Sequence, residues 1–404
     1  MNSSSSTDVP TPGPLTSERK HIAVFNVPQP GHVNPTLGLV AELVARGHRV
    51  SYALTDDFRT QVEAVGATLV AYRPTDTEVE LPEDLVAGAI LAFRQVLSAL
   101  PELAVAFSDD VPDVVLYDVS AAAGGLLAAY WQVPAIRLSP SHLPYEGVLP
   151  EMYGVPDLTH VPELDEARGL LTAHGLNMTL EELLLEPEHA VAFLPRAFQR
   201  KPDAVTARAV TYAGPGLTDR SYQGSWTPPA DGRPVLLVSL GTQFTRRPEF
   251  YQACVDAFAD SHWHVVMAVG NSVDPEGFAS VPASMEIMRR VPQLDVLSHA
   301  AAFVTHGGMG SVMGALAHGV PLVVVPQMSE QLVNARQVEH LSLGRHLPRE
   351  EATPQALRDA VDTVTTDPEV TRGVAALRQA IEEAGGAATG ADAVEKVLAS
   401  VITA

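Results

Sequence analysis

The sequence predicts an α/β fold of two doubly wound, mostly parallel sheets, and three observations predict it. Strand-like and helix-like segments alternate from residue 20 onward, a stretch rich in Gly, Pro and Asp interrupts them near the middle, and the alternation then resumes. Consecutive strand–helix–strand units imply parallel crossovers in each half. The 404 residues also exceed what one compact core usually holds, which favours two domains.

The first half, residues 20–213, opens with an apolar strand, HIAVFNV. We expect the following helix to begin at Asn34 and Pro35, because Asn can cap a first turn and Pro suits the first helical position. Further strands are expected in HRVSYALT, ATLVAYR, DVVLYD and PAIRLS, with a helical stretch over 87–107 before DVVLYD. Residues 140–190 break the rhythm with prolines and short acidic helices, which is typical of a variable binding loop.

The remaining segments complete the domain organisation. Residues 1–19 are rich in Ser, Pro and Thr and lack an apolar core, so we expect a disordered tail and no signal peptide. Residues 214–232 are predicted to form the linker, residues 233–388 the second domain, and residues 389–404 a final helix.

Composition limits the possible partners. A net charge of −22 repels polyphosphate and argues against a nucleic-acid partner. The single cysteine, Cys254, cannot form an internal disulfide and fits a reducing compartment. No apolar run approaches the roughly 18 residues of a membrane span. We therefore expect a cytoplasmic protein that binds no membrane. We expect it to be a monomer or a homodimer, a choice that the sequence does not decide.

Two polar residues stand where strands of the first half end. His32 follows the first strand, and Asp118 ends DVVLYD. Ligands of open α/β folds bind at the carboxyl edge of the sheet, where these two side chains could meet. Asp118 could then hold one ring nitrogen of His32 and leave the other as a base. A structural role for a lone histidine remains the alternative.

Two turns in the second half could bind phosphate. HGGMGS, residues 306–311, follows an apolar strand and opens a helix, so its backbone N–H groups could approach an anion. SLGT, residues 239–242, is a similar turn, and two facing turns suit a diphosphate. Glycines that only shorten a loop are the alternative. Nearby, Arg290 could stack on a base or simply be solvated, and Glu330 with Gln331 could bind sugar hydroxyls or simply open a helix.

PGHVNP, the YD at Asp118, SLGT and the block RVPQLDVLSHAAAFVTHGGMGS…GVPLVVVPQMSEQ together resemble the family 1 glycosyltransferases, most closely the bacterial macrolide glycosyltransferases such as those that glucosylate oleandomycin. The resemblance runs from about residue 20 to the C-terminus. It implies a GT-B fold, in which two Rossmann-like domains face each other across a cleft. The N-terminal domain would bind the acceptor and the C-terminal domain the nucleotide sugar, with the final helix crossing back to the first domain.

The resemblance also implies roles for individual residues. His32 would be the general base and Asp118 its partner. The donor would be bound by Ser239, Gly241, Thr242, Arg290, Val291, Gln293, His306, Gly308, Gly310, Ser311, Glu330 and Gln331. Candidate acceptor contacts are Gln29 and Pro30 beside the base and His142, Leu143, Tyr145 and Val148 in the 140–190 excursion, with loop packing as their alternative.

One position departs from the family pattern. Relatives commonly read S-x-x-E, with the Glu on the ribose diol, whereas this chain reads SVMG and has Gly314 there. The resemblance implies a UDP-dependent hexosyltransferase, and the missing carboxylate weakens that expectation. TDP is the alternative donor nucleotide, because its deoxyribose has no 2′-hydroxyl and would lose less, and weak or altered donor binding is a further alternative.

The expected reaction is an inverting transfer of a sugar, expected to be glucose, to a hydroxyl of a hydrophobic natural product such as a macrolide or a flavonoid. No Asp-x-Asp motif ends a suitable strand, so neither a metal nor another cofactor is expected beyond the nucleotide sugar. A nucleotide-sugar epimerase of the same fold and a catalytically degenerate partner or activator protein are the alternatives. An NAD-linked oxidoreductase is disfavoured because G-x-G-x-x-G is missing after the first strand.

Overall fold

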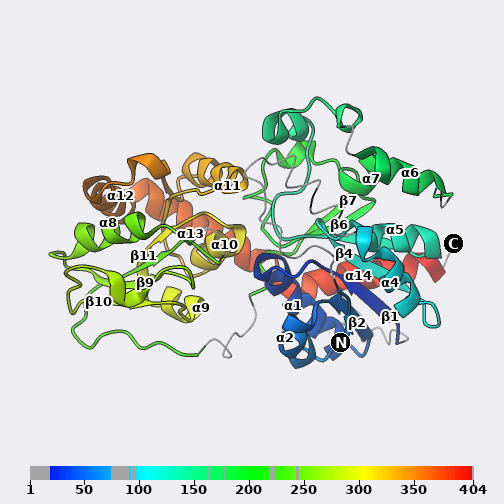
Figure 1. Cartoon of the computed structure of the whole chain (residues 1–404), viewed down its shortest axis with the longest axis horizontal. Coiled ribbons are helices and arrows are strands. Elements are labelled where there is room, and N and C mark those ends of the chain that lie inside the picture. The colour runs from blue at the N-terminus through cyan, green and yellow to red at the C-terminus, as the bar shows by residue number, and fades with distance from the viewer. Residues whose placement is uncertain are drawn as a thin grey trace, which may run out of the picture.

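The computed structural model describes residues 19–73, 91, 94, 97–161, 164–173, 175–176, 178–217, 224–242 and 245–402. The predicted tail therefore lies outside the described residues except for Arg19, as do residues 218–223 of the predicted linker and most of 87–96. Figure 1 shows two lobes, each built around one sheet, with α1, α10 and α11 close to the place where the lobes meet.

The first lobe is an α/β layer structure around a parallel sheet, as predicted. Its strands in spatial order are β3 (Thr68–Ala71), β2 (Arg49–Leu54), β1 (His21–Phe25), β4 (Val114–Asp118), β5 (Ala135–Ser139), β6 (His189–Ala192) and β7 (Ala209–Tyr212). β1 and β4 are buried along their whole length and lie next to each other, with Phe25 opposite Tyr117. The turn that follows β1 and the last residue of β4 therefore lie at the same edge of the sheet.

Helices cover both faces of this sheet. They are α1 (Pro30–Ala45), α2 (Arg59–Ala64), α4 (Leu100–Ala106), α5 (Ala122–Trp131), α6 (Asp165–Ala173) and α7 (Leu180–Leu184). The apolar side of α1 packs on one face, and α4, α5 and α7 pack on the other. The 140–190 excursion contains α6, α7 and a π-helical turn over Leu149–Tyr153.

The predicted start of α1 is wrong. The helix begins at Pro30 and not at Pro35, its N-cap is Gln29, and no side chain caps it. Both prolines fit a first turn, but the helix begins at the earlier one and continues through Pro35. Because Pro35 has no N–H, the helix lacks the hydrogen bond to the carbonyl of Gly31. His32 consequently lies inside the first turn of α1 and not in a loop before it.

The second lobe repeats the architecture around another parallel sheet. Its strands in spatial order are β10 (Met285–Met288), β9 (His264–Ala268), β8 (Val235–Ser239), β11 (Ala300–Thr305), β12 (Leu322–Val324) and β13 (Gly344–His346). Its helices are α8 (Pro248–Phe258), α9 (Gln293–Leu297), α10 (Met309–Ala317), α11 (Ser329–His340), α12 (Pro354–Thr366) and α13 (Pro368–Glu383). Both sheets thus match the predicted doubly wound style.

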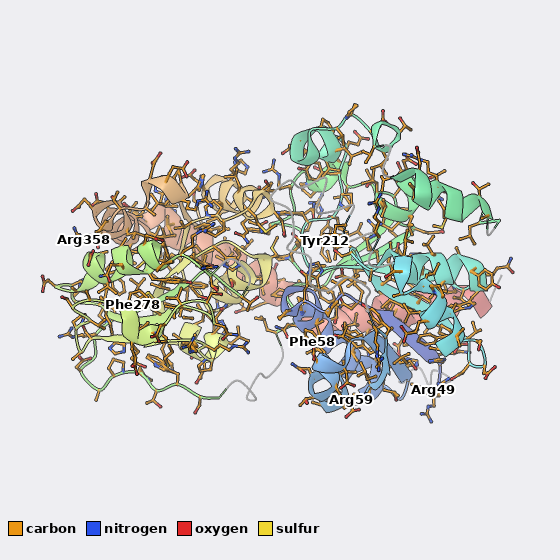
Figure 2. The ribbon with its side chains drawn as sticks, in the orientation of Figure 1. Arg49, Phe58, Arg59, Tyr212, Phe278 and Arg358 are labelled. Atoms are coloured by element: carbon orange, nitrogen blue, oxygen red, sulfur yellow. The ribbon has the colours of Figure 1, made fainter. Side chains whose placement is uncertain are left out.

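The two lobes share apolar packing. Leu143, Leu194 and Phe198 of the first lobe belong to the same buried cluster as the strands of the second, and Tyr212, labelled in Figure 2, packs against that cluster. The last helix, α14 (Gly386–Ile402), starts slightly earlier than predicted and buries one side against the first lobe, where it meets α1. No helix in the described ranges is both long enough and apolar enough to cross a membrane.

Candidate active site

His32 and Asp118 are in direct contact. Nδ1 of His32 lies 2.9 Å from Oδ1 of Asp118. The carboxylate is fully buried, whereas the imidazole side chain is 24 % exposed. The backbone N–H of Ser120 also donates to Oδ1, at 2.7 Å, which fixes the carboxylate from the turn after β4. A carboxylate only accepts, so Nδ1 carries the hydrogen and Nε2 is left as the basic nitrogen.

The surroundings of His32 set its proton affinity. Burial on its own would lower the pKa of the imidazole. The charge of Asp118, the hydrogen bond to it and the charge of Glu330 outweigh burial and hold the pKa of His32 above its ordinary value. The nitrogen is therefore a stronger base than a free histidine, although at a given pH less of it is unprotonated.

A buried polar network lies behind this dyad, and the sequence reasoning missed it. The amide of Asn26 donates to the carbonyl of His32 at 3.2 Å and to the hydroxyl of Tyr52 at 2.9 Å. Tyr52 in turn bonds with Thr36 at 2.6 Å, and the hydroxyl of Tyr72 donates to the carbonyl of Asn26 at 3.0 Å. The network ties the first turns of α1 to β1 and β2. Its only sequence signal is that Asn26 and Tyr52 interrupt apolar strands.

The network consists of neutral groups. Burial raises the pKa of Tyr52 and of Tyr72, and the nearby charge of Asp118 raises both further. Both hydroxyls therefore stay protonated and act as hydrogen-bonding supports. The basic group that this network holds at the edge of the sheet is the imidazole of His32.

In the second lobe, the two predicted turns meet around His306. A β-carbon placed on Gly241 would lie 2.6 Å from Nε2 of His306, and one placed on Gly308 would lie 2.4 Å from the same atom. Only glycines allow the ring to fit between the turns. Burial lowers the pKa of His306 to about 4, with the backbone of Ser239 opposing the shift slightly. His306 is therefore neutral near pH 7.

The N-terminus of α10 lies beside this ring. Gly308 is the N-cap, and a β-carbon on Gly310 would meet nothing within 4 Å, so the approach to the first turn is open there. The hydroxyl of Ser311 accepts a hydrogen bond from Gln293 at 3.3 Å, which connects α10 with the start of α9. Exposed backbone N–H groups at such a helix start suit an anion.

The other predicted donor residues surround the same turns. Ser239 is buried at the end of β8, and its hydroxyl accepts the N–H of Gly241 at 3.2 Å. Thr242 and Arg290 are exposed, and Val291 is half-buried. Gln331 is buried at the start of α11, where its side-chain oxygen accepts the N–H of Gln327 at 2.8 Å.

Gly314 lies inside α10 and contacts α9. A β-carbon there would lie 3.2 Å from Cδ2 of Leu294 and 3.5 Å from Cδ1 of Leu297. Leucine side chains therefore occupy the space that a longer residue at this position would enter. The ribose carboxylate of the family pattern is missing from α10, and apolar packing takes its place.

The predicted acceptor residues fall into two groups. Gln29 is half-buried and Pro30 exposed at the start of α1, beside His32. In the excursion, His142 stacks on Phe198 with ring centroids 5.5 Å apart. Leu143 and Tyr145 are fully buried and Val148 nearly so, and Lys201 lies 4.9 Å from the centre of the Tyr145 ring. These four residues of the excursion pack within the protein, as the loop-packing alternative expects. Their contact with an acceptor stays a prediction.

No group of three or more His, Cys, Asp or Glu side chains is arranged to hold a metal ion in the part of the chain that the structure describes. The polar groups brought together are instead the His32–Asp118 dyad, the glycine turns around His306, and the start of α11. Their chemistry combines one base with donors for an anion.

Comparison with known proteins identifies the family. Residues 252–397 match the family described as erythromycin biosynthesis protein CIII-like, C-terminal domain. The NDP-glycosyltransferase YjiC of Bacillus licheniformis is 40 % identical to this chain over 94 % of the chain and 98 % of the relative. The chain belongs to the family 1 glycosyltransferases.

Two further glycosyltransferases are similar to this chain over nearly its whole length. Oleandomycin glycosyltransferase of Streptomyces antibioticus is 36 % identical over 94 % of this chain and 91 % of its own length. The crystal structure of CalG4, the calicheamicin glycosyltransferase, superposes with a TM-score of 0.83 at 37 % identity, covering 95 % of this chain and all of that one. The resemblance to macrolide glycosyltransferases and the GT-B fold are thereby confirmed.

Proposed function

We propose that this glycosyltransferase transfers a sugar, expected to be glucose, from a nucleoside diphosphate to a hydroxyl of a hydrophobic natural product, with inversion at the anomeric carbon. The observation that carries the proposal is the hydrogen bond between His32 and buried Asp118. It leaves Nε2 as a base on the partly exposed side of the dyad, at the carboxyl edge of the first sheet.

In the proposed reaction, Nε2 of His32 takes the proton of the acceptor hydroxyl. The acceptor oxygen forms a bond to C1 of the sugar while the bond from C1 to the diphosphate oxygen breaks. The electron pair of that bond leaves with the nucleoside diphosphate. Attack from the face opposite the leaving group inverts C1, so an α-linked donor gives a β-glycoside. General-base help of this kind contributes about 10²–10⁴-fold to the rate.

The second lobe would stabilise the departing diphosphate. The first turn of α10 offers backbone N–H groups, and the ring of neutral His306 lies between the two glycine turns, where its N–H would exchange the backbone of Ser239 for a diphosphate oxygen. Such donors are already oriented before charge develops on the leaving oxygen. Glu330 and Gln331 at the start of α11 would bind the hydroxyls of the transferred sugar.

The acceptor would bind in the first lobe near Gln29, Pro30 and His32. The names of the relatives favour a natural product such as a macrolide, and a flavonoid or other phenol is the second acceptor class to test. For the donor, Gly314 removes a ribose carboxylate and Leu294 occupies the neighbouring space, so TDP is tested beside UDP.

The deciding experiment follows sugar transfer by mass spectrometry. UDP-glucose and TDP-glucose are offered separately with oleandomycin and with a flavonol, using the wild-type protein, His32→Ala, and His340→Ala as a matched control at an exposed histidine of α11. We expect transfer that is lost in His32→Ala and kept in His340→Ala, and an anomeric proton coupling typical of a β-linkage.

Other outcomes would contradict the proposal. Equal transfer by His32→Ala would remove His32 as the base. An α-linked product would contradict inversion. A change of the donor sugar without any acceptor would indicate the epimerase, and no reaction with either donor or acceptor would favour a non-catalytic partner protein.

A further inference from the structure

One face of α11 is fastened to the first lobe. Glu330, Asn334 and Gln337 follow one another at spacings of four and three residues, which places them on the same side of the helix. The hydroxyl of Ser141, which follows β5, donates to Oε1 of Glu330 at 2.9 Å. At the other end of this face, the amide of Gln337 donates to the buried carbonyl of Phe198 at 3.1 Å.

The middle residue of this face is the most buried. Asn334 is fully buried, and its amide donates to the carbonyl of Gly307 at 2.8 Å. Its side chain also lies against His142, whose pKa burial and Arg200 lower to about 3 while the Asn334 amide opposes the shift. α11 therefore has contacts to both lobes that do not involve Ser141, through Asn334 to Gly307 and through Gln337 to Phe198.

The contact between Ser141 and Glu330 therefore restricts the Glu330 side chain and does not serve the core. Both side chains are only half-buried, so neither is needed to complete the core. Glu330 has three rotatable side-chain bonds and would lose that freedom on binding a ligand. A carboxylate that is already anchored through one oxygen loses less, which favours binding through the other.

The carboxylate is also close to the proposed reaction centre. Its charge is among the causes that raise the pKa of His32, so Glu330 lies within electrostatic reach of the base. The next residue, Gln331, is fixed independently, because its side-chain oxygen accepts the N–H of Gln327. Of Glu330 and Gln331, Glu330 is therefore the one that accepts a hydrogen bond from the first lobe.

We propose that Ser141 is a positioning residue for the transferred sugar: its hydroxyl holds Oε1 of Glu330, so that Oε2 is set to accept a hydrogen bond from a sugar hydroxyl. The inference rests on the proposed function, because it assumes that Glu330 binds the donor sugar. It adds that a residue of the acceptor-side lobe helps to build the donor subsite, so the sugar is recognised across both lobes.

The test measures donor binding without acceptor, by calorimetry. UDP-glucose, TDP-glucose and the free diphosphates UDP and TDP are titrated into the wild type, Ser141→Ala and Ser141→Thr. We expect Ser141→Ala to weaken binding of the nucleotide sugar about three- to tenfold, the range for one lost intramolecular hydrogen bond. Binding of the free diphosphate should not change. Ser141→Thr keeps a hydroxyl and should bind the nucleotide sugar like the wild type.

Two further variants separate this role from general effects. Ser108→Ala removes a hydroxyl that donates to the carbonyl of Val105 elsewhere in the first lobe, and it should bind every ligand like the wild type. Glu330→Ala should weaken sugar binding, and adding Ser141→Ala to it should have no further effect, because Ser141 then has no carboxylate to hold.

The contrary results are equally definite. Unchanged or tighter sugar binding by Ser141→Ala would overturn the inference, since the hydroxyl would then be idle or would compete with the sugar. If Ser141→Ala weakened binding of the free diphosphate as much as binding of the nucleotide sugar, Ser141 would act on the packing between the lobes, which would also overturn the inference. If the wild type transfers sugar and Ser141→Ala binds the nucleotide sugar equally well, this inference alone is refuted. If the wild type binds neither nucleotide sugar, the proposed function is refuted with it.

Discussion

Nδ1 of His32 and Oδ1 of Asp118 lie 2.9 Å apart although 86 positions separate the two residues in the chain. The contact exists because β1 and β4 are neighbours in a parallel sheet, so that the turn after one and the end of the other share an edge. The carboxylate does two things for the imidazole: it selects the tautomer with hydrogen on Nδ1, and it raises the affinity of Nε2 for a proton.

Replacing the charge of Asp118 should therefore reduce activity without removing the base. We expect Asp118→Asn to lower kcat about 10²–10⁴-fold, because an amide favours the wrong tautomer and no longer stabilises the imidazolium. The pKa of His32, followed by NMR, should fall, since burial remains while the opposing charge is gone. Asp57→Asn, an exposed aspartate of the same lobe, serves as the control. Full activity in Asp118→Asn would contradict the dyad.

The raised pKa of His32 predicts the acid side of the pH profile. The base must be unprotonated to accept a proton, so kcat/KM should fall as the pH drops through the pKa of His32. That limb should lie above the ordinary histidine value of about 6.5. In Asp118→Asn the limb should move to lower pH. A wild-type limb well below the ordinary value would contradict the electrostatics of the site.

The raised pKa of His32 also makes the free energy of unfolding depend on pH, but this contribution decreases as the pH rises, whereas activity increases. Because the folded state binds the His32 proton more tightly than the unfolded state, this residue contributes stability that is complete below the unfolded pKa. The contribution disappears as the pH rises through the folded value. Urea unfolding of wild type and His32→Gln across this range should show a difference that is largest at the acid end. A constant difference would contradict the linkage.

The sequence predicted the features that depend on local pattern. Alternating strands and helices, glycines after β11, and polar residues at strand ends all leave a signal within a few residues. The carboxyl-edge rule then indicated that His32 and Asp118 could meet. The start of α1 was misjudged because Pro30 and Pro35 carry the same local signal, and only packing in the folded chain decides between them.

Other parts of the site have no local signal. The bond from Ser141 to Glu330 joins positions 189 residues apart in two lobes, and the Asn26–Tyr52 bond depends on which strands are neighbours. Leu294 fills the space beside Gly314 because α9 packs against α10. Such contacts follow from the spatial arrangement of elements, which no spacing along the chain encodes directly.

The transfer reaction should not need a divalent cation. In the proposed reaction the start of α10 and neutral His306 would stabilise the leaving group, so activity after treatment with EDTA should equal that of untreated protein within error. Adding Mg²⁺ or Mn²⁺ back should change the rate by less than about twofold, given that one lost metal contact would be worth several kcal/mol. An activity that EDTA abolishes and Mg²⁺ restores would contradict this prediction.

Removing Arg46 should loosen the last helix. Arg46 follows the last residue of α1, and its Nη1 lies 2.6 Å from Oδ1 of Asp392 and 2.8 Å from Oε2 of Glu395. These ion pairs connect α14 to the first lobe. Because these pairs are partly solvated, we expect Arg46→Ala to lower the free energy of unfolding by only about 0.5–1 kcal/mol. Amide hydrogen exchange over 386–402 should become faster.

The control is Arg372→Ala, which removes an exposed pair with Glu369 at 3.7 Å within α13. It should leave the exchange of α14 unchanged. If both variants behaved alike, the ion pairs between α1 and α14 would contribute nothing specific, and the buried apolar side of α14 alone would hold the helix.

Position 314 should control the choice of nucleotide. Gly314→Glu combined with Leu294→Ala supplies a carboxylate and frees the space that Cδ2 of Leu294 occupies. A charge-assisted hydrogen bond to the 2′-hydroxyl of ribose would be worth about 1.5–3 kcal/mol, so the preference for UDP-glucose over TDP-glucose should rise about tenfold or more. The measurement is the ratio of kcat/KM for the two donors.

The matched control for this change is Gly314→Ala with Leu294→Ala, which adds the β-carbon without the charge and should leave the ratio as in the wild type. The two double variants differ by one methylene and the carboxylate, and only the carboxylate can accept a hydrogen bond from ribose, so a shift confined to the glutamate variant would locate the ribose beside α10. The same shift in both would mean that repacking of α9 sets the preference. No shift in either would mean that the nucleoside does not pass position 314.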